Sequence, residues 1–277
     1  REGVTVRALV VINPGNPTGQ VLSVEDMRGI VDLCVREGLI LCADEVYQEN
    51  VWEEEKEFVS FRKVAIEMGY TGEEEITKPG EGLQLVSFHS VSKGFLGECG
   101  LRGGYFQVHG IPAAAAAQVY KLASISLCSN TVGQLTTGLM CALPRPGSPS
   151  FKKFARERDA ILGSMRRRAA QLGAALNRLE GVSCNSAQGA MYVFPRITLP
   201  RRAVAAAAAE GVAPDAFYCM RLLEATGIIV VPGSGFGQQE GTWHFRTTFL
   251  PSEARMAGVV DRLARFHAAF MDQYRDD

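Results

Sequence analysis

The residues best placed to do chemistry lie in the stretch from Ser87 to Tyr105, SFHSVSKGFLGECGLRGGY. The apolar run that leads into this stretch predicts a buried strand, which ends in a polar loop carrying Lys93. A lysine just past a buried strand is energetically costly unless it is exposed, paired or used covalently. Such a lysine can form a Schiff base, and Ser90, Ser92 and Arg102 offer the hydroxyl and guanidinium groups that hold a phosphate. A solvated lysine without a chemical role is the alternative, and this stretch alone does not decide between the two.

Two earlier loops carry further polar residues at the ends of apolar runs. Asn16 follows the run 6–12 within a loop rich in proline and glycine, and Asp44 and Tyr47 follow the run 39–43. Ligands of open α/β sheets bind beyond the carboxyl ends of the strands, where such loops meet. Each residue alone has a simpler explanation, Asn16 as a turn residue and Asp44 as a helix cap. Together with the lysine loop they form a candidate site.

The elements around these loops predict a mostly parallel sheet. Ser23 is suited to an N-cap, Glu25 and Asp26 favour the first turn of a helix, and Gly38 ends that helix after Glu37. A strand, a helix and a second strand in fewer than fifty residues form a βαβ unit with a right-handed crossover. Further strands are expected at 83–88 and 104–108, and further helices at 60–68, 112–122 and 131–142.

A proline-rich segment at 144–149 predicts a domain boundary, since its three prolines and one glycine cannot continue a helix. We expect residues 1–147 to form the later part of a large domain and residues 148–277 to form a small α+β domain. In the small domain, helices are expected at 151–180, 204–209, 214–226 and 252–274, and strands at 182–184, 190–194, 228–231 and 243–249.

Composition excludes several classes of protein. The 277 residues carry a formal net charge of -1, which gives no electrostatic reason to expect nucleic acid or an anionic membrane as a partner. No apolar stretch is long enough to span a bilayer. The seven cysteines show no CxxC spacing, so buried thiols in a reducing compartment are expected rather than disulfides or a zinc site. No metal is expected.

Five sequence blocks resemble one family across nearly the whole chain. These blocks are NPGNPTGQV, ADEVYQENV, SFHSVSKGFLGECGLRGGY, QGAMYVFPRI and VVPGSGFGQQEGTWHFR. They are similar to the fold-type I aminotransferases that use pyridoxal 5'-phosphate (PLP), and within that family to the alanine aminotransferases. The resemblance implies an α/β large domain with an α+β small domain, and ping-pong amino transfer from L-alanine to 2-oxoglutarate, giving pyruvate and L-glutamate.

The resemblance also implies roles for the residues that match its motifs. Lys93 would bind PLP covalently and shuttle a proton at the substrate Cα. Asp44 would keep the pyridine nitrogen protonated, while Tyr47 and Asn16 would bind the phenolic oxygen of the ring. The phosphate would be held by Ser90, Ser92 and Arg102, and the substrate carboxylate by Arg246 and Asn16.

The sequence departs from the family in what it lacks. Family members have an N-terminal half that supplies strands, phosphate contacts and an aromatic residue stacked on PLP, and nothing before Val6 can supply these. We therefore expect a fragment with weak activity or none, from a homodimeric enzyme of the cytoplasm or mitochondria. A PLP-dependent lyase of the aminocyclopropane-carboxylate synthase type is the alternative within the fold. A non-catalytic regulatory module is the alternative outside enzymes.

Overall fold

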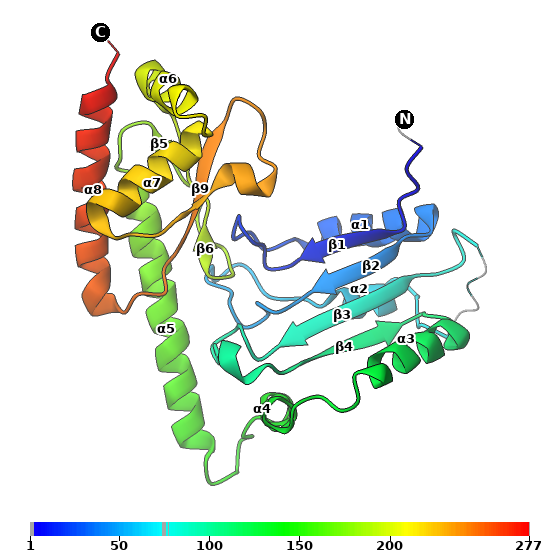
Figure 1. The fold of residues 1–277 in the computed structure, drawn as a ribbon. Helices are drawn as coiled ribbons and strands as arrows, with labels where there is room; N and C mark the ends of the chain where they lie inside the picture. The colour runs from blue at the N-terminus through cyan, green and yellow to red at the C-terminus, as the bar shows by residue number, and fades with distance from the viewer. Residues whose placement is uncertain (1–2, 74–75, 77, 277) are drawn as a thin grey trace. The chain divides into compact units, whose positions relative to one another are not determined.

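The computed structural model describes residues 3–73, 76 and 78–276 (Figure 1). The chain divides into two compact units. The first unit contains the residues up to Gly15 and those from Gln20 to Glu157, and the second contains Asn16–Gly19 and the residues from Arg158 onward. The proposed functional boundary after Gly147 stays a prediction. No helix among the described residues is long and apolar enough to cross a membrane.

The first unit is built on a four-stranded sheet in the order β1-β2-β3-β4. The strands are β1 (Ala8–Ile12), β2 (Ile40–Asp44), β3 (Gln84–Ser90) and β4 (Gly104–His109). β1, β2 and β3 are parallel, and β4 pairs antiparallel with β3. Ile12, Asp44 and Phe88 lie in register across the three parallel strands, so the loops that follow these strands leave the sheet at one edge.

Helices α1 (Val24–Glu37) and α2 (Phe61–Glu67) form one hydrophobic core with β2 and β3. The Ser23 side chain caps α1 by accepting a hydrogen bond from the Asp26 amide, and Gly38 ends the helix with φ 64°. Both signals were predicted from the sequence, and both are confirmed. Met27, Leu41 and Phe61 are completely buried in this core, which fixes the sheet against the two helices.

Helices α3 (Ala113–Ile125) and α4 (Thr131–Cys141) complete the first unit after β4. They carry exposed apolar side chains, among them Leu122 at 68% and Leu135 at 65%. β4 exposes Phe106 at 48%, and β1 exposes Val10 at 67%. Large apolar side chains exposed in such number can mark a contact with another polypeptide segment.

The second unit packs its helices on a small antiparallel sheet. Its strands are β5 (Val182–Ser183), β6 (Tyr192–Val193), β7 (Arg196–Ile197), β8 (Val231–Pro232) and β9 (Trp243–Thr248), ordered β5-β7-β9-β6 with β8 also on β9. Its helices are the later part of α5 (Phe151–Leu176), α6 (Arg201–Ala209), α7 (Pro214–Thr226) and α8 (Glu253–Tyr274), with the 3-10 turn η2 (Gly233–Phe236) after β8. The prediction of an α/β first part and an α+β second part is confirmed.

Two local predictions for the second unit were wrong, and one strand was missed. The helix expected to reach Glu180 ends at Leu176, and the side chain of Asn177, the next residue, exchanges two hydrogen bonds with the Cys184 backbone, at 2.9 and 2.8 Å. The strand expected at 228–231 is reduced to Val231–Pro232, and β7 was not predicted. The expectation of buried thiols was met only in part, since Cys34 and Cys219 are buried whereas three thiols of the first unit are exposed: Cys99, Cys128 and Cys141.

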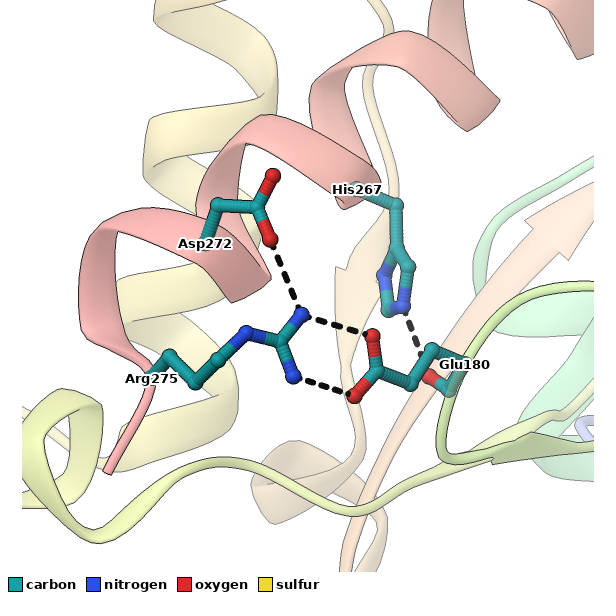
Figure 2. Close-up of polar contacts among 4 residues, drawn as sticks. All are labelled: Glu180, His267, Asp272 and Arg275. Carbon is teal, nitrogen blue, oxygen red and sulfur yellow. Dashed lines mark hydrogen bonds and ion pairs between the residues drawn. The ribbon is translucent and has the colours of Figure 1, made fainter. Parts of the chain in front are cut away.

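A polar cluster joins the end of α8 to the turn after α5 (Figure 2). Arg275 donates to both carboxylate oxygens of Glu180 at 2.9 and 3.0 Å, and also to Asp272 at 2.9 Å. His267 Nε2 lies 2.8 Å from the Glu180 carbonyl oxygen and must donate to it. Its Nδ1 therefore accepts from the Tyr218 hydroxyl, 2.9 Å away, when the ring is neutral. Burial keeps Tyr218 protonated by raising its pKa.

We expect the second unit to lose stability in mild acid because of His267. Burial lowers the pKa of this ring below its usual 6.5, despite the opposing effect of the Glu180 carbonyl. The unfolded state therefore binds a proton more readily, and stability that is present above pH 6.5 is lost as the pH falls through the folded pKa. The melting temperature measured between pH 8 and pH 5 should fall in the range below about 6.5.

His267→Gln is the matched variant for this measurement. It should be less stable at pH 8 and should show a shallower decline toward pH 5. Some decline should remain, because burial also lowers the pKa values of His89 and His244. An identical pH profile for the variant and the unmodified chain would contradict the role given to His267.

Candidate functional site

Lys93 lies in the loop after β3, three residues beyond the end of the strand. Its side chain lines a pocket together with Gln48, His89 and Ser90. Among the described residues no hydrogen bond or ion pair engages its ammonium group. Burial raises the pKa of the Asp44 carboxyl, and the charge of Lys93 is near enough to offset part of that effect. A lysine amine without a structural partner in the described residues is chemically suited to covalent use, and that role stays a prediction.

Asp44 is the last residue of β2, half-buried at the carboxyl edge of the sheet. Burial raises the pKa of its carboxyl, while the Val46 amide and the charges of His89 and Lys93 partly offset this effect. Within the described residues its side chain accepts one hydrogen bond, from the Val46 amide at 3.3 Å. The remaining acceptor capacity is free for a protonated nitrogen, which would also stabilise the charged carboxylate.

Glu45 anchors the turn that carries Tyr47. Its buried carboxylate accepts from the Phe61 amide at 2.8 Å and from the Ser60 hydroxyl at 3.0 Å, both at the start of α2. Tyr47 is itself only 2% exposed. In sequence, Glu45 could equally be an ordinary surface acid, but the structure shows a buried carboxylate that fixes the turn after Asp44.

Ser90, Ser92 and Arg102 come together in the loop between β3 and β4. The Ser90 hydroxyl accepts from the Ser92 amide at 3.1 Å and donates to the Gly103 carbonyl at 3.1 Å. Arg102 Nη1 lies 3.5 Å from the Ser92 hydroxyl and 2.8 Å from the Cys99 carbonyl. The one proton of the Ser90 hydroxyl is thus engaged within the loop, whereas the Ser92 hydroxyl and the Arg102 guanidinium retain donors that can bind a phosphate by charge-assisted hydrogen bonds.

Neighbouring residues hold this loop in place. Cys99 Sγ donates to the Ser92 carbonyl at 3.1 Å, and Asn130 Nδ2, at the cap of α4, donates to the Arg102 carbonyl at 3.0 Å. His89 packs edge-on against Tyr105 and its Nε2 lies 3.1 Å from Gln48 Nε2. The Nδ1 atom of His89 is buried without a partner within the part of the chain described.

Asn16 and Arg246 meet in the second unit. Arg246 Nη1 donates to Asn16 Oδ1 at 2.9 Å, which leaves the amide nitrogen of Asn16 free to donate elsewhere. The guanidinium lies between two aromatic rings, 4.6 Å from the centre of Tyr192 and 5.0 Å from that of Phe236. Its Nε is buried and has no acceptor among the described residues. A buried donor left without a partner indicates an anionic ligand, and a planar fork suits a carboxylate.

Tyr192 and Phe236 were not predicted as site residues. For Tyr192 a signal lay in the alternation Tyr192, Phe194, Arg196, which is typical of side chains on one face of extended chain. Phe236, in η2, had no such signal. The buried Asp215 positions Phe236 by accepting from the Ser234 amide at 2.6 Å. That contact joins α7 to η2 and could not be read from spacing in the chain.

Gly19 ties Asn16 to the second unit. It has φ +72°, and its carbonyl accepts from the Gly189 amide at 2.8 Å. A Cβ at this position would lie 2.7 Å from the Tyr192 carbonyl oxygen, closer than real Cβ contacts allow. Only glycine meets both the backbone conformation and the close approach.

We expect Gly19→Ala to lower the free energy of unfolding by about 2–4 kcal/mol, through left-handed strain and the clash with the Tyr192 carbonyl. Urea titration measures the loss. Gly211→Ala is the matched control, because Gly211 has φ +70° but nothing within 4 Å of an added Cβ. The control should cost about 1 kcal/mol. Equal losses in the two variants would show that the close approach at Gly19 has no energetic effect.

The candidate residues thus form two sets. In the first unit, the structure assembles an amine, a carboxylate, a buried tyrosine and a loop with two hydroxyls and a guanidinium: Lys93, Asp44, Tyr47, Ser90, Ser92 and Arg102. In the second unit, Arg246 donates a hydrogen bond to Asn16. The chemistry of the first set is compatible with a phosphorylated aldehyde that has a ring nitrogen, and that of the second with a carboxylate, and both roles stay predictions.

Comparisons with known proteins agree with this chemistry. The family model of aminotransferases of class I and II matches residues 1–263. An Arabidopsis thaliana protein named alanine aminotransferase 2, mitochondrial, is 58% identical over 275 residues, which are 99% of this chain and 49% of that protein. Glutamate–glyoxylate aminotransferase 2 of the same plant is 49% identical over 276 residues, covering 100% of this chain and 56% of the relative.

A solved structure matches the fold as well. An alanine aminotransferase from Pyrococcus furiosus superimposes with a TM-score of 0.72 at 25% identity, covering 97% of this chain and 60% of that one. The chain therefore spans about half the length of the curated relatives it matches.

Proposed function

Because the chain belongs to the class I and II aminotransferase family, we propose that the protein transfers an amino group from L-alanine to 2-oxoglutarate with PLP as its cofactor. The products are pyruvate and L-glutamate, formed in two half-reactions by a ping-pong mechanism. The observation that carries the proposal is the unpartnered amine of Lys93 beside Asp44 at the carboxyl edge of the sheet. The similarity to alanine aminotransferases supports the choice of substrates.

Bound PLP supplies an electron-withdrawing ring that stabilises the negative charge left at the substrate Cα when its proton departs. Lys93 holds the cofactor covalently and then takes and returns the Cα proton. Asp44 keeps a proton on the ring nitrogen through its free acceptor capacity. The loop of Ser90, Ser92 and Arg102 would hold the phosphate of the cofactor, so that retention of the cofactor would not depend on Lys93 alone.

The remaining groups orient the substrate. Tyr47, and the amide nitrogen of Asn16, would donate to the phenolic oxygen of the cofactor, as the family resemblance implies. Arg246 holds the substrate carboxylate with two parallel hydrogen bonds, one of them from its unpartnered Nε. The same clamp serves both the amino acid and the oxo acid. We infer a homodimer of the cytoplasm or mitochondria, as the family resemblance implies.

A spectrophotometric assay of pyruvate tests this function. Pyruvate should form from L-alanine only when 2-oxoglutarate is present in amounts above the enzyme concentration. Formation without an oxo acid would instead indicate a PLP-dependent lyase. Since one relative is named for glutamate and glyoxylate, glyoxylate is the second acceptor to compare. If kcat/KM is higher for the pair L-glutamate and glyoxylate than for L-alanine and 2-oxoglutarate, L-glutamate replaces L-alanine as the proposed amino donor.

The assay should be run on the 277-residue chain and on the complete product of its coding sequence. The chain alone should show weak turnover or none, because its first unit exposes apolar side chains such as Val10, Phe106 and Leu122. Full turnover by the chain alone would contradict that expectation without affecting the proposed reaction. A non-catalytic module would show no turnover in either form.

A further inference from the structure

One face of the second unit's sheet presents two arginines. Arg196 on β7 pairs with His244 on β9, and Tyr192 on β6 pairs with Thr248. His244 and Arg246 are two residues apart on β9 and therefore point to the same face. Phe245, between them, points into the core and is completely buried. Arg196 and Arg246 consequently lie on the face opposite to Phe245, as diagonal neighbours on adjoining strands.

Diagonal neighbours in an antiparallel pair are separated by roughly 7–8 Å, within reach of long side chains. The segment 16–18 gives independent evidence that Arg196 and Arg246 lie close together. Asn16 accepts a hydrogen bond from Arg246, and Thr18, only two residues further along, lines a pocket with Arg196. The Arg246 clamp and the Arg196 pocket are therefore adjacent.

The Arg196 pocket has a volume of about 370 Å³, within the range of small-molecule sites. Apart from Arg196 and the Phe194 ring, its lining consists of neutral polar groups: Thr18, Asn185, Gln238, Gln239, Thr242 and His244. Among the described residues no carboxylate pairs with Arg196 and no acceptor takes its hydrogen bonds. The pocket therefore offers a positive charge and several donors, without a carboxylate in its lining to neutralise them.

Two contacts hold the polar lining in place. Gln238 Nε2 donates to the buried carboxylate of Asp215 at 2.9 Å, which turns its Oε1 toward His244 Nδ1, 3.0 Å away. His244 stacks on Phe194 with ring centres 4.9 Å apart. Burial lowers the pKa of His244, and the nearby charge of Arg196 lowers it further, so the imidazole stays neutral beside the arginine.

We propose that Arg196 binds the distal carboxylate of a five-carbon dicarboxylic substrate whose first carboxylate is held by Arg246. The inference rests on the proposed function, which requires the enzyme to accept 2-oxoglutarate and L-glutamate as well as L-alanine. The methylene groups of the longer substrate would contact the Phe194 ring, the apolar part of the Arg196 pocket. L-Alanine is held by Arg246 alone and leaves the Arg196 pocket to water.

Binding of two simple acids to the 277-residue chain, measured by calorimetry without PLP, tests the proposal. Glutarate carries two carboxylates on five carbons, and butyrate carries one carboxylate on a similar chain. We expect glutarate to bind about tenfold more tightly than butyrate, as one added charge-assisted contact implies. Arg196→Gln should remove this preference by weakening glutarate alone, and Arg196→Lys should keep part of it.

Two further variants serve as controls, one for the carboxylate site that both acids share and one for the loss of a positive charge. Arg246→Gln should weaken both acids, whereas Arg178→Gln, which removes an exposed arginine from the turn after α5, should change neither. Undetectable glutarate binding, or an unchanged preference in Arg196→Gln, overturns the inference. If pyruvate assays succeed while Arg196 proves irrelevant, only the inference fails. If Arg196-dependent binding is found without amino transfer, only the proposed function fails.

Discussion

Replacing Lys93 with alanine is expected to abolish the visible absorbance of bound PLP and to lower amino transfer by roughly 1,000-fold or more. The amine lies beside Asp44, engages no partner in the described structure, and lines a pocket with Ser90 and Gln48. No other lysine lines this pocket, so none can replace its proton transfer. Absorbance spectra and steady-state rates measure the two effects. Borohydride reduction followed by peptide mass spectrometry should find the fixed cofactor on Lys93.

Two variants separate chemistry from folding. Lys63→Ala removes an exposed lysine of α2 whose weak ion pair to Glu67, at 4.0 Å, contributes little, and it should behave like the unmodified protein. Lys93→Arg keeps a positive charge near Asp44 but cannot bind the cofactor covalently. It should hold PLP by its phosphate contacts and still be inactive. An unchanged spectrum in Lys93→Ala would remove Lys93 as the anchor.

The sequence predicted best those features that depend on neighbouring residues. Ser23 and Gly38 bound α1 because a cap acts on amides and carbonyls within a few residues. The βαβ unit followed from two apolar runs with an amphipathic helix between them, and the register of β1, β2 and β3 then brings the loops together. For this reason the sequence alone was enough to expect Asp44 and Lys93 near one another.

Contacts between distant segments were beyond local reasoning. The side chain of Asn177, just beyond the end of α5, bonds to the Cys184 backbone, and β7 forms by pairing with β5 and β9 on either side of it. Two aromatic rings lie near Arg246 of β9. Tyr192 comes from β6, which is far from β9 in the chain, and Phe236 comes from η2, in the connection between β8 and β9. Periodicity identifies which face of a strand a residue occupies, but it does not identify the residues that lie opposite.

The functional roles of the site residues were predicted from two kinds of information: residue chemistry and family resemblance. Elementary chemistry indicated Lys93, Ser90, Ser92 and Arg102 from residue type and position. The role of Arg246 came from the family resemblance alone, since an arginine in a strand is usually a surface residue. The structure supplies the missing physical reason: the guanidinium is held by Asn16 and two rings, and its Nε is buried without a partner among the described residues.

Replacing Arg246 with glutamine is expected to lower kcat/KM for both L-alanine and 2-oxoglutarate by roughly 100- to 1,000-fold, mostly through KM. The variant loses the planar fork that matches a carboxylate and leaves the substrate's charge unpaired between Tyr192 and Phe236. The variant also leaves Asn16 Oδ1 without the hydrogen bond that it accepts from Arg246 in the unmodified protein. Steady-state kinetics with each substrate varied in turn measure the loss.

Arg246→Lys distinguishes the fork from the charge. A lysine keeps the positive charge but offers no second parallel donor, so we expect it to recover only part of the affinity. Arg255→Gln, on an exposed position of α8, is the control for removing one positive charge from the second unit and should leave both KM values unchanged. Because every substrate of the proposed reaction presents a carboxylate to the same clamp, the loss must appear with both. A variant that lost affinity for 2-oxoglutarate and kept it for L-alanine would assign Arg246 to the distal carboxylate, and the substrate would then have to lie in the opposite direction along the sheet.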